Sequence, residues 1–152
     1  NSQRNQTIVD IVENIKQINS KARIMILTKN LNHVNILQDL IEGAYRLWGD
    51  DNISTRYSVI SKFLNSKTST VLIGTKILQT GINIEEITHL INARGLKSEI
   101  ATIQALGRAL RKHESKSEVY IYDFMDNARY LSADSKRRKS YYISEGHEVK
   151  VI

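Results

Sequence analysis

The chain has 152 residues, a formal net charge of +6 at pH 7 and no Cys. This length fits one domain with a sizeable core, and the lack of Cys excludes disulfides and thiolate metal sites. The four histidines lack the spacing of metal ligands, so we expect no structural metal. No apolar run approaches the roughly 18 residues of a membrane span, so we expect no membrane protein. The excess of Lys and Arg favours an anionic partner such as nucleic acid.

Helical patterns and short apolar runs alternate along the chain. Apolar residues at helical spacing predict a helix over residues 7–18, and the apolar run 24–27 predicts a buried strand. The other predicted elements are, in chain order, a helix over 31–41 that stops at Gly43, a strand at 45–48, a helix that begins at Ser54 or Thr55 and runs to Leu64, strands at 70–73 and 89–92, a helix that begins at Ser98, a strand at 118–124, a basic helix at 128–145 and a short strand at 147–152.

Most of the predicted strands read as apolar runs, and only the strand at 118–124 alternates between apolar and polar residues. This pattern favours an α/β fold in which a mostly parallel sheet is flanked by helices on both faces. In such folds, ligands bind at the carboxyl ends of the strands, where helix N-termini also attract anions. The residues predicted at these ends can donate hydrogen bonds to phosphate, and they are Thr28, Lys29, Asn30, Thr75 and Lys76.

The helix that begins at Ser98 carries a distinctive polar face. Gln104, Gly107, Arg108 and Arg111 recur at i, i+3, i+4 and i+7, which places them on one side of a helix. Arginine suits phosphate because its planar group donates two parallel hydrogen bonds and stays charged. The glycine suggests a close approach to the backbone. A solvated amphipathic helix has the same spacing, so the spacing alone leaves both interpretations open.

Several segments resemble the motifs of superfamily 2 helicases and follow one another in the same order as those motifs, over about residues 7–125. The matching segments are residues 24–30 for motif IV, Gly49, Arg56 and Phe63 for the pattern that follows it, residues 71–75 with 80–84 for motif V, and residues 104–111 for the Gln-x-x-Gly-Arg-x-x-Arg pattern of motif VI. A narrower similarity to phage UvsW-type DNA helicases, which act on branched recombination and replication intermediates, runs through residues 80–82, 96–98 and 110–113.

The resemblance implies a RecA-like three-layer fold, with the second RecA-like domain of a motor over residues 1–125. Residues 126–152 would form a basic helix and short strand packed on that domain or extending it. The sequence lacks the Gly-x-x-x-x-Gly-Lys-Ser/Thr phosphate loop and an Asp-Glu pair after a strand. We therefore expect ATP with Mg²⁺ to be held mainly by an N-terminal RecA-like domain of the same full-length chain, and we expect no ATPase activity without that domain. The expected location is the cytoplasm, that of a host if the protein is phage-encoded.

The resemblance also implies roles for individual residues. Arg108 and Arg111 are expected to act as arginine fingers on the γ-phosphate, with Gln104 organising the same surface. The nucleotide would lie against Gly81, Asn83 and Gly107, although many relatives carry Asp at the position of Asn83. The residues expected to contact the backbone of a branched or duplex DNA, without sequence preference, are Thr28, Lys29, Asn30, Thr75 and Lys76.

Alternative interpretations exist at two levels. For the whole chain, the alternatives are the translocase half of a restriction enzyme, an RNA helicase, or a stand-alone nucleic-acid-binding module without an ATPase role. For single residues, Thr28 and Thr75 could simply cap helices. For Trp48 and Tyr120 we expect packing in the core or against a subunit rather than stacking on bases. The basic run 136–139 is either a solvated helical face or a DNA-binding patch.

Overall fold

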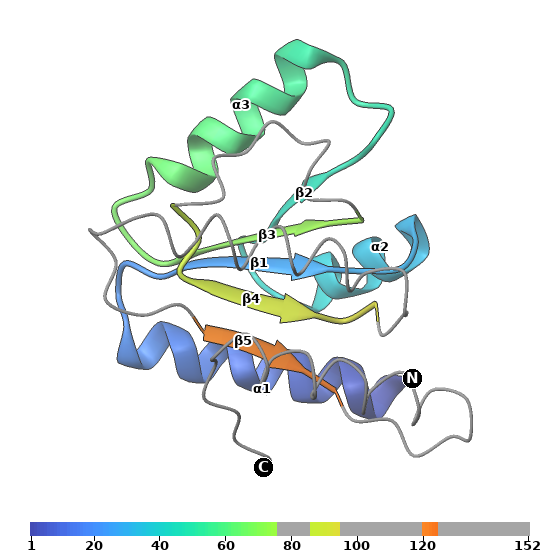
Figure 1. Cartoon of the computed structure of the whole chain (residues 1–152), viewed down its shortest axis with the longest axis vertical. Coiled ribbons are helices and arrows are strands. Elements are labelled where there is room, and N and C mark those ends of the chain that lie inside the picture. The colour runs from blue at the N-terminus through green and yellow to red at the C-terminus, as the bar shows by residue number, and fades with distance from the viewer. Residues whose placement is uncertain (76–85, 95–119, 125–152) are drawn as a thin grey trace, which may run out of the picture.

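The computed structural model describes residues 1–75, 86–94 and 120–124. The elements in these ranges are, in chain order, α1 (Ser2–Ile18), β1 (Arg23–Leu27), α2 (Leu31–Leu40), β2 (Tyr45–Leu47), α3 (Ile53–Leu64), β3 (Thr70–Gly74), β4 (His89–Asn92) and β5 (Tyr120–Asp123). All strand pairs are parallel, in the order β2-β3-β1-β4-β5 (Figure 1). The predicted α/β fold with a parallel sheet is therefore confirmed.

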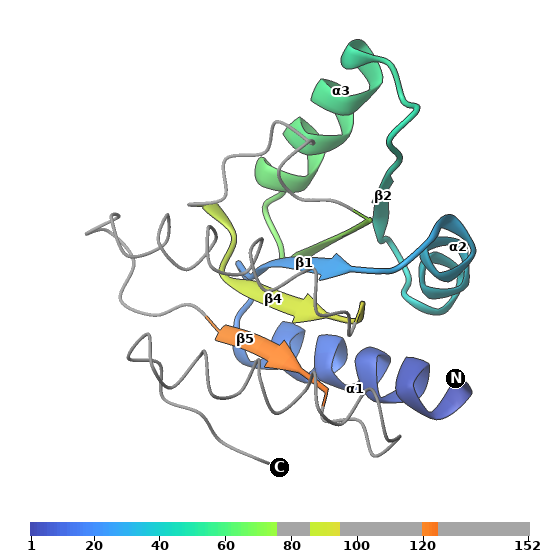
Figure 2. The same cartoon turned by 45° about the vertical axis from the view of Figure 1, so that its right-hand side comes forward.

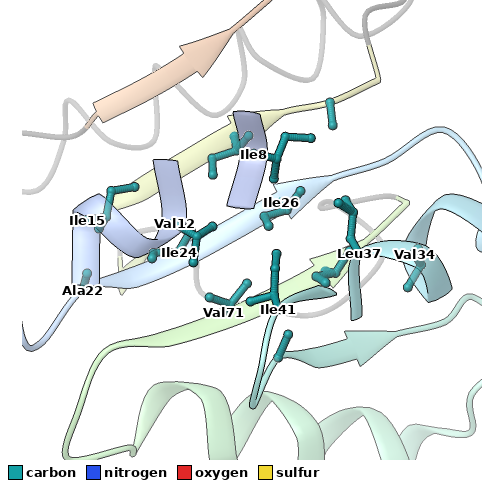
Figure 3. Packing of buried hydrophobic residues seen from close by; sticks show 14 residues of the cluster. Ile8, Val12, Ile15, Ala22, Ile24, Ile26, Val34, Leu37, Ile41 and Val71 are labelled. Atoms are coloured by element: carbon teal, nitrogen blue, oxygen red, sulfur yellow. The ribbon is translucent and has the colours of Figure 1, made fainter. Parts of the chain in front are cut away.

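Helices α1 and α2 cover one face of the sheet. Ile8 and Val12 of α1 and Leu37 of α2 point toward Ile24 and Ile26 of β1, and all five side chains are fully buried (Figure 3). Burying one such side chain contributes about 1.5–3 kcal/mol. The helical spacing of apolar residues in α1 and α2 is thus explained by contact with this face.

Helix α3 covers the opposite face. Its buried residues Ile60 and Phe63 pack in a cluster with Met25 and Leu27 of β1 and with Leu72 of β3. Successive residues of β1 therefore enter two different clusters, because side chains alternate across a strand. Burial on both faces is the reason why the strands lack the apolar–polar alternation of a half-exposed sheet.

Helix ends follow asparagine caps that the sequence patterns did not identify. Helix α1 begins at Ser2, earlier than predicted, because the Asn1 side chain accepts hydrogen bonds from two backbone N–H groups of the first turn, at 3.0 and 3.2 Å. Helix α3 begins at Ile53, and its cap is Asn52, whose Oδ1 accepts from Thr55 N at 2.8 Å. The prediction that Ser54 or Thr55 caps this helix is therefore wrong, and the better-ranked Asn takes that place.

The turn after α2 matches the prediction of a stop at Gly43. The helix ends at Leu40 and is capped by Ile41, and Gly43 has a φ of +76°, a conformation that glycine adopts without steric cost. Three predicted elements lie outside the described residues: the helix from Ser98, the basic helix at 128–145 and the strand at 147–152. Among the helices that the structure describes, none is long and apolar enough to cross a membrane.

Candidate nucleic-acid interface

The carboxyl ends of the strands and the starts of the helices gather at one edge of the sheet. Because the strands are parallel, their carboxyl ends share that edge. The N-terminal end of α1 and the start of α2 lie beside the tips of the strand arrows (Figures 1 and 2). We call the residues that follow β1 to β4, together with the first turns of α1, α2 and α3, the carboxyl edge. The opposite ends of the strands form the amino edge.

The loop after β1 presents two exposed side chains and one buried one. Thr28 is fully buried; its backbone N–H donates to Gly74 O at 2.9 Å, and its hydroxyl lies 3.5 Å from the carbonyl oxygens of Gly74 and Asn30. Lys29 and Asn30 are exposed. The Asn30 side chain caps α2 by accepting from His33 N at 3.0 Å. The cap of α2 is thus Asn30, and Thr28 holds the loop against β3.

The loop after β3 is fixed by an arginine that follows β4. Thr75 is half-buried, and its backbone carbonyl accepts a hydrogen bond from the Arg94 guanidinium. The Arg94 backbone N–H donates in turn to Oδ1 of the buried Asn92, at 3.3 Å. Since β1 lies between β3 and β4, the Arg94 side chain spans the end of β1. The sequence analysis did not single out Arg94, and its position two residues after a buried strand is the one signal that could have marked it.

The loop after β2 is ordered by the residues whose spacing the sequence analysis noted. The Arg56 guanidinium donates to the backbone carbonyl of Gly49, and Phe63 is fully buried under α3. The spacing of Gly49, Arg56 and Phe63 is therefore explained, because one end of α3 holds the loop while the other anchors the helix to the sheet. Two carboxylates complete the loop, with Asp51 accepting from Trp48 N at 2.9 Å and Asp50 accepting from Trp48 Nε1 at 3.1 Å.

The helix N-termini of α1 and α2 give the carboxyl edge a positive character, whereas Asp50 and Asp51 directly precede the cap of α3. The caps of α1, α2 and α3 are Asn1, Asn30 and Asn52, which are neutral, and the first turn of each helix contains no acidic residue. The partial positive charge of a helix N-terminus, roughly half an elementary charge, is thus not neutralised by a cap or by a first-turn carboxylate. Such helix ends favour phosphate groups, and the exposed Lys29 adds a full charge beside the start of α2.

The imidazole of His33 lies between α2 and α1, close to positively charged groups. Its Nε2 lies 2.8 Å from Asn5 Oδ1, which joins α2 to α1. Burial lowers the pKa of His33 from 6.5, and the positive charges of the chain N-terminus and Arg4 lower it further. Both causes disfavour the imidazolium form of His33, so the positive potential at this place comes from its neighbours.

The remaining predicted site residues are distributed unevenly. Tyr120 is 47% exposed and stacks on His89, with ring centroids 5.1 Å apart, at the amino edge. The expectation that Tyr120 packs internally is therefore only partly met. Within the described ranges, no group of three or more His, Asp or Glu residues could hold a metal ion. The predicted site residues outside these ranges are Lys76, Gly81, Asn83, Gln104, Gly107, Arg108 and Arg111.

Comparison with known proteins gives relatives over most of the chain. Residues 3–113 match the helicase conserved C-terminal domain. The ATP-dependent DNA helicase uvsW of Enterobacteria phage T4 is 28% identical over 144 residues, which cover 92% of this chain and 28% of that protein. A putative ATP-dependent RNA helicase of Methanocaldococcus jannaschii is 30% identical over 142 residues, which cover 87% of this chain and 18% of that protein. The chain thus spans well under half the length of these relatives.

Structural comparison agrees with the family match. The crystal structure of T4 UvsW superposes with a TM-score of 0.76 at 23% sequence identity, covering 97% of this chain and 33% of that chain. The parallel sheet with helices on both faces is that of the RecA-like domains in helicases. The chain therefore belongs to the helicase conserved C-terminal domain family, as the second RecA-like domain of a superfamily 2 helicase related to UvsW.

Proposed function

We propose that this chain is the C-terminal motor domain of an ATP-dependent DNA helicase that acts on branched or duplex DNA, such as recombination, replication-fork or repair intermediates. The observation that carries the proposal is the carboxyl edge, where the neutrally capped N-termini of α1 and α2 and the exposed Lys29 gather in a domain of this family. Phosphate contacts of this kind carry no sequence information, so binding is sequence-tolerant and weakens as salt rises.

The strand contacts divide into direct contacts and supports. Lys29 and Asn30 are exposed and can meet the backbone directly, and Thr75 presents its half-buried side chain beside them. Lys76 continues the same loop in the sequence. The buried Thr28 supports the edge by fixing the loop after β1 to β3, so a direct contact between Thr28 and phosphate stays a prediction.

ATP hydrolysis needs a second half of the motor. In this proposal an N-terminal RecA-like domain of the same full-length chain holds most of ATP and Mg²⁺, because this sequence has no phosphate loop. Arg108 and Arg111 reach across as arginine fingers, which are worth about 10³–10⁵ in rate in related nucleotidases. The residues proposed to shape the rest of the nucleotide surface are Gln104, Gly107, Gly81 and Asn83. A cytoplasmic location also stays a prediction.

An RNA helicase is the second candidate, since one relative carries that name. A restriction-enzyme translocase and a stand-alone binding module complete the alternatives. Stimulation of ATP turnover in the full-length chain by branched DNA, duplex DNA and single-stranded RNA separates the first three. A binding module would show no turnover with any of them.

Replacement of Arg111 by Ala in the full-length chain tests the proposal. DNA-stimulated ATP turnover should fall by about three orders of magnitude or more, while the Kd for DNA changes little, because a finger acts on the γ-phosphate. Replacement of Lys29 by Ala is the matched change at the strand-binding loop and should weaken DNA binding. Unchanged turnover in Arg111→Ala contradicts the proposed role.

A further inference from the structure

Trp48 is the one tryptophan of the chain, and it lies at the carboxyl edge directly after β2. The register pairs Leu47 with Gly74, which sets Trp48 level with Thr75 on the neighbouring strand. The next strand in the sheet is β1, followed by the exposed Lys29. Trp48 therefore follows the strand next to β3 and two strands from β1, at the same edge as the loops proposed to meet the nucleic acid backbone.

The position of Trp48 is not explained by core packing. The residue is half-buried, and neither of the two apolar clusters formed by the described residues includes it. Its backbone N–H and its indole N–H donate to Asp51 and Asp50, and Asp51 N donates back to Trp48 O at 3.1 Å. Arg56 fixes the next residue by its hydrogen bond to Gly49 O. The loop thus holds the ring in one orientation at the edge.

The local charges decide which part of a nucleic acid suits this ring. Asp50 and Asp51 flank the indole, and carboxylates repel phosphate, so the backbone is disfavoured here. A neutral base carries no such penalty. Because the polar N–H of the indole is already satisfied by Asp50, a ligand at this half-buried ring would meet its apolar surface, and aromatic faces stack on bases of any sequence.

We propose that Trp48 is a stacking platform for an unpaired nucleobase of the strand whose backbone binds at the carboxyl edge. This inference rests on the proposed function, and it adds a base contact to an interface otherwise built from backbone contacts. It also assigns a role to the loop that Arg56 and Gly49 order: the loop holds Trp48 at the carboxyl edge, next to the end of β3.

The test compares two single strands of equal length, an oligothymidylate and a strand of abasic sites, which keeps the phosphates and lacks the bases. Binding is followed by anisotropy of labelled strands and by the fluorescence of Trp48, which is the one tryptophan signal of the 152-residue chain. The variants are Trp48→Leu and Trp48→Phe, and Tyr120→Leu is the matched control, because Tyr120 is an exposed aromatic residue at the amino edge.

The oligothymidylate should quench the Trp48 fluorescence of the unsubstituted chain, and the abasic strand should not. Trp48→Leu should raise the Kd for the oligothymidylate about 5- to 30-fold and leave the Kd for the abasic strand within about twofold. Trp48→Phe should lie in between, because a smaller ring still stacks. Tyr120→Leu should change neither Kd.

Two results would overturn the inference in different ways. If the unsubstituted chain binds both strands with equal affinity and without quenching, or if Trp48→Leu weakens both equally, stacking is excluded and backbone binding stands. If the unsubstituted chain binds neither strand, the proposed nucleic-acid interface fails, and the stacking platform fails with it. The quenching comparison needs no substitution, so it decides the matter even where Trp48→Leu does not fold.

Discussion

The guanidinium group of Arg94 donates a hydrogen bond to the backbone carbonyl of Thr75 and so joins the ends of β4 and β3 across the end of β1. This contact sets the loop after β3, which carries two of the residues proposed to meet DNA, against the loop after β1, which carries the others. Arg94 lies outside the segments that resemble helicase motifs, but its hydrogen bond fixes the loops of two such segments relative to each other.

Replacing Arg94 by Met removes the hydrogen bond from the guanidinium group to the Thr75 carbonyl. We expect the Kd for single-stranded DNA to rise about 3- to 10-fold, because the Thr75 loop loses its fixed position at a cost comparable to one hydrogen bond. Arg94→Lys, which can still donate to the carbonyl, should recover much of the affinity. Anisotropy titrations at several salt concentrations check the reason: a support leaves the salt slope unchanged, whereas a slope reduced by about one unit would make Arg94 a direct phosphate contact.

Replacing Asn30 by Asp tests the electrostatics of the carboxyl edge without removing a cap. Asp caps helices as well as Asn, so the free energy of unfolding should stay within about 0.5 kcal/mol or rise slightly. The added negative charge should raise the Kd for DNA about 3- to 10-fold at low salt, and the difference should shrink at high salt.

The matched control for that substitution is Asn65→Asp, which adds the same charge at the C-cap of α3. This end of the helix lies at the amino edge, so DNA affinity should be nearly unchanged. Equal losses of affinity in the two variants would mean that overall charge, and not the carboxyl edge, governs binding.

Arg23 should be a stabilising residue with no part in binding. At the amino edge its guanidinium donates to Leu64 O at 3.2 Å, Thr68 O at 2.9 Å and Ser66 O, and thereby ties the end of α3 to the start of β1. Arg23→Met should lower the free energy of unfolding by about 2 kcal/mol, since these are charge-assisted bonds at a partly exposed site. Urea unfolding measures the loss, and an altered Kd for DNA in the folded variant would contradict the assignment.

His89 should make the fold sensitive to acid. Burial lowers the pKa of His89 from 6.5; its ring stacks against Tyr120 and Tyr122 of the neighbouring strand, and its Nδ1 is 2.8 Å from the Thr88 hydroxyl. Because the folded state disfavours the imidazolium, the unfolded chain binds more protons below pH 6.5, and stability falls as pH decreases through that range. The loss is at most about 1.4 kcal/mol per pH unit.

Urea unfolding at pH 8 and pH 5 measures this dependence. His89→Phe keeps an aromatic ring and removes the titration, so the difference in stability between the two pH values should become smaller. His33→Gln is measured in parallel, because the pKa of His33 is lowered in the same direction. An unchanged pH dependence in His89→Phe would exclude His89 as its source.

Much of the fold follows from the sequence because its signals are local. Short apolar runs predicted β1, β3 and β4, and their lack of alternation predicted a parallel sheet buried on both faces. The strand order could not be predicted in this way, because pairing β1 between β3 and β4 depends on contacts far apart in the chain. The start of α3 was misplaced because Asn52, Ser54 and Thr55 are all suitable cap residues, and only the backbone geometry selects one of them.

The candidate site was predicted unevenly for a related reason. The strand ends after β1 and β3 were located from the sequence, since polar residues follow apolar runs there. The burial of Thr28 was not foreseen, because a polar residue type favours exposure and only the contact with Gly74 explains its place inside. The hydrogen bond from Arg94 to Thr75 joins residues 19 positions apart along the chain, so no local pattern announces it.

The most direct measurement is ATP turnover with branched DNA present, for the 152-residue chain alone and for the full-length chain that includes a phosphate-loop domain. The account predicts no turnover by the chain alone and DNA-stimulated turnover when the two halves are joined, because the arginines of residues 104–111 would complete a divided active site. Turnover by the chain alone, or none in the joined protein, would contradict the claim that this domain is half of a motor.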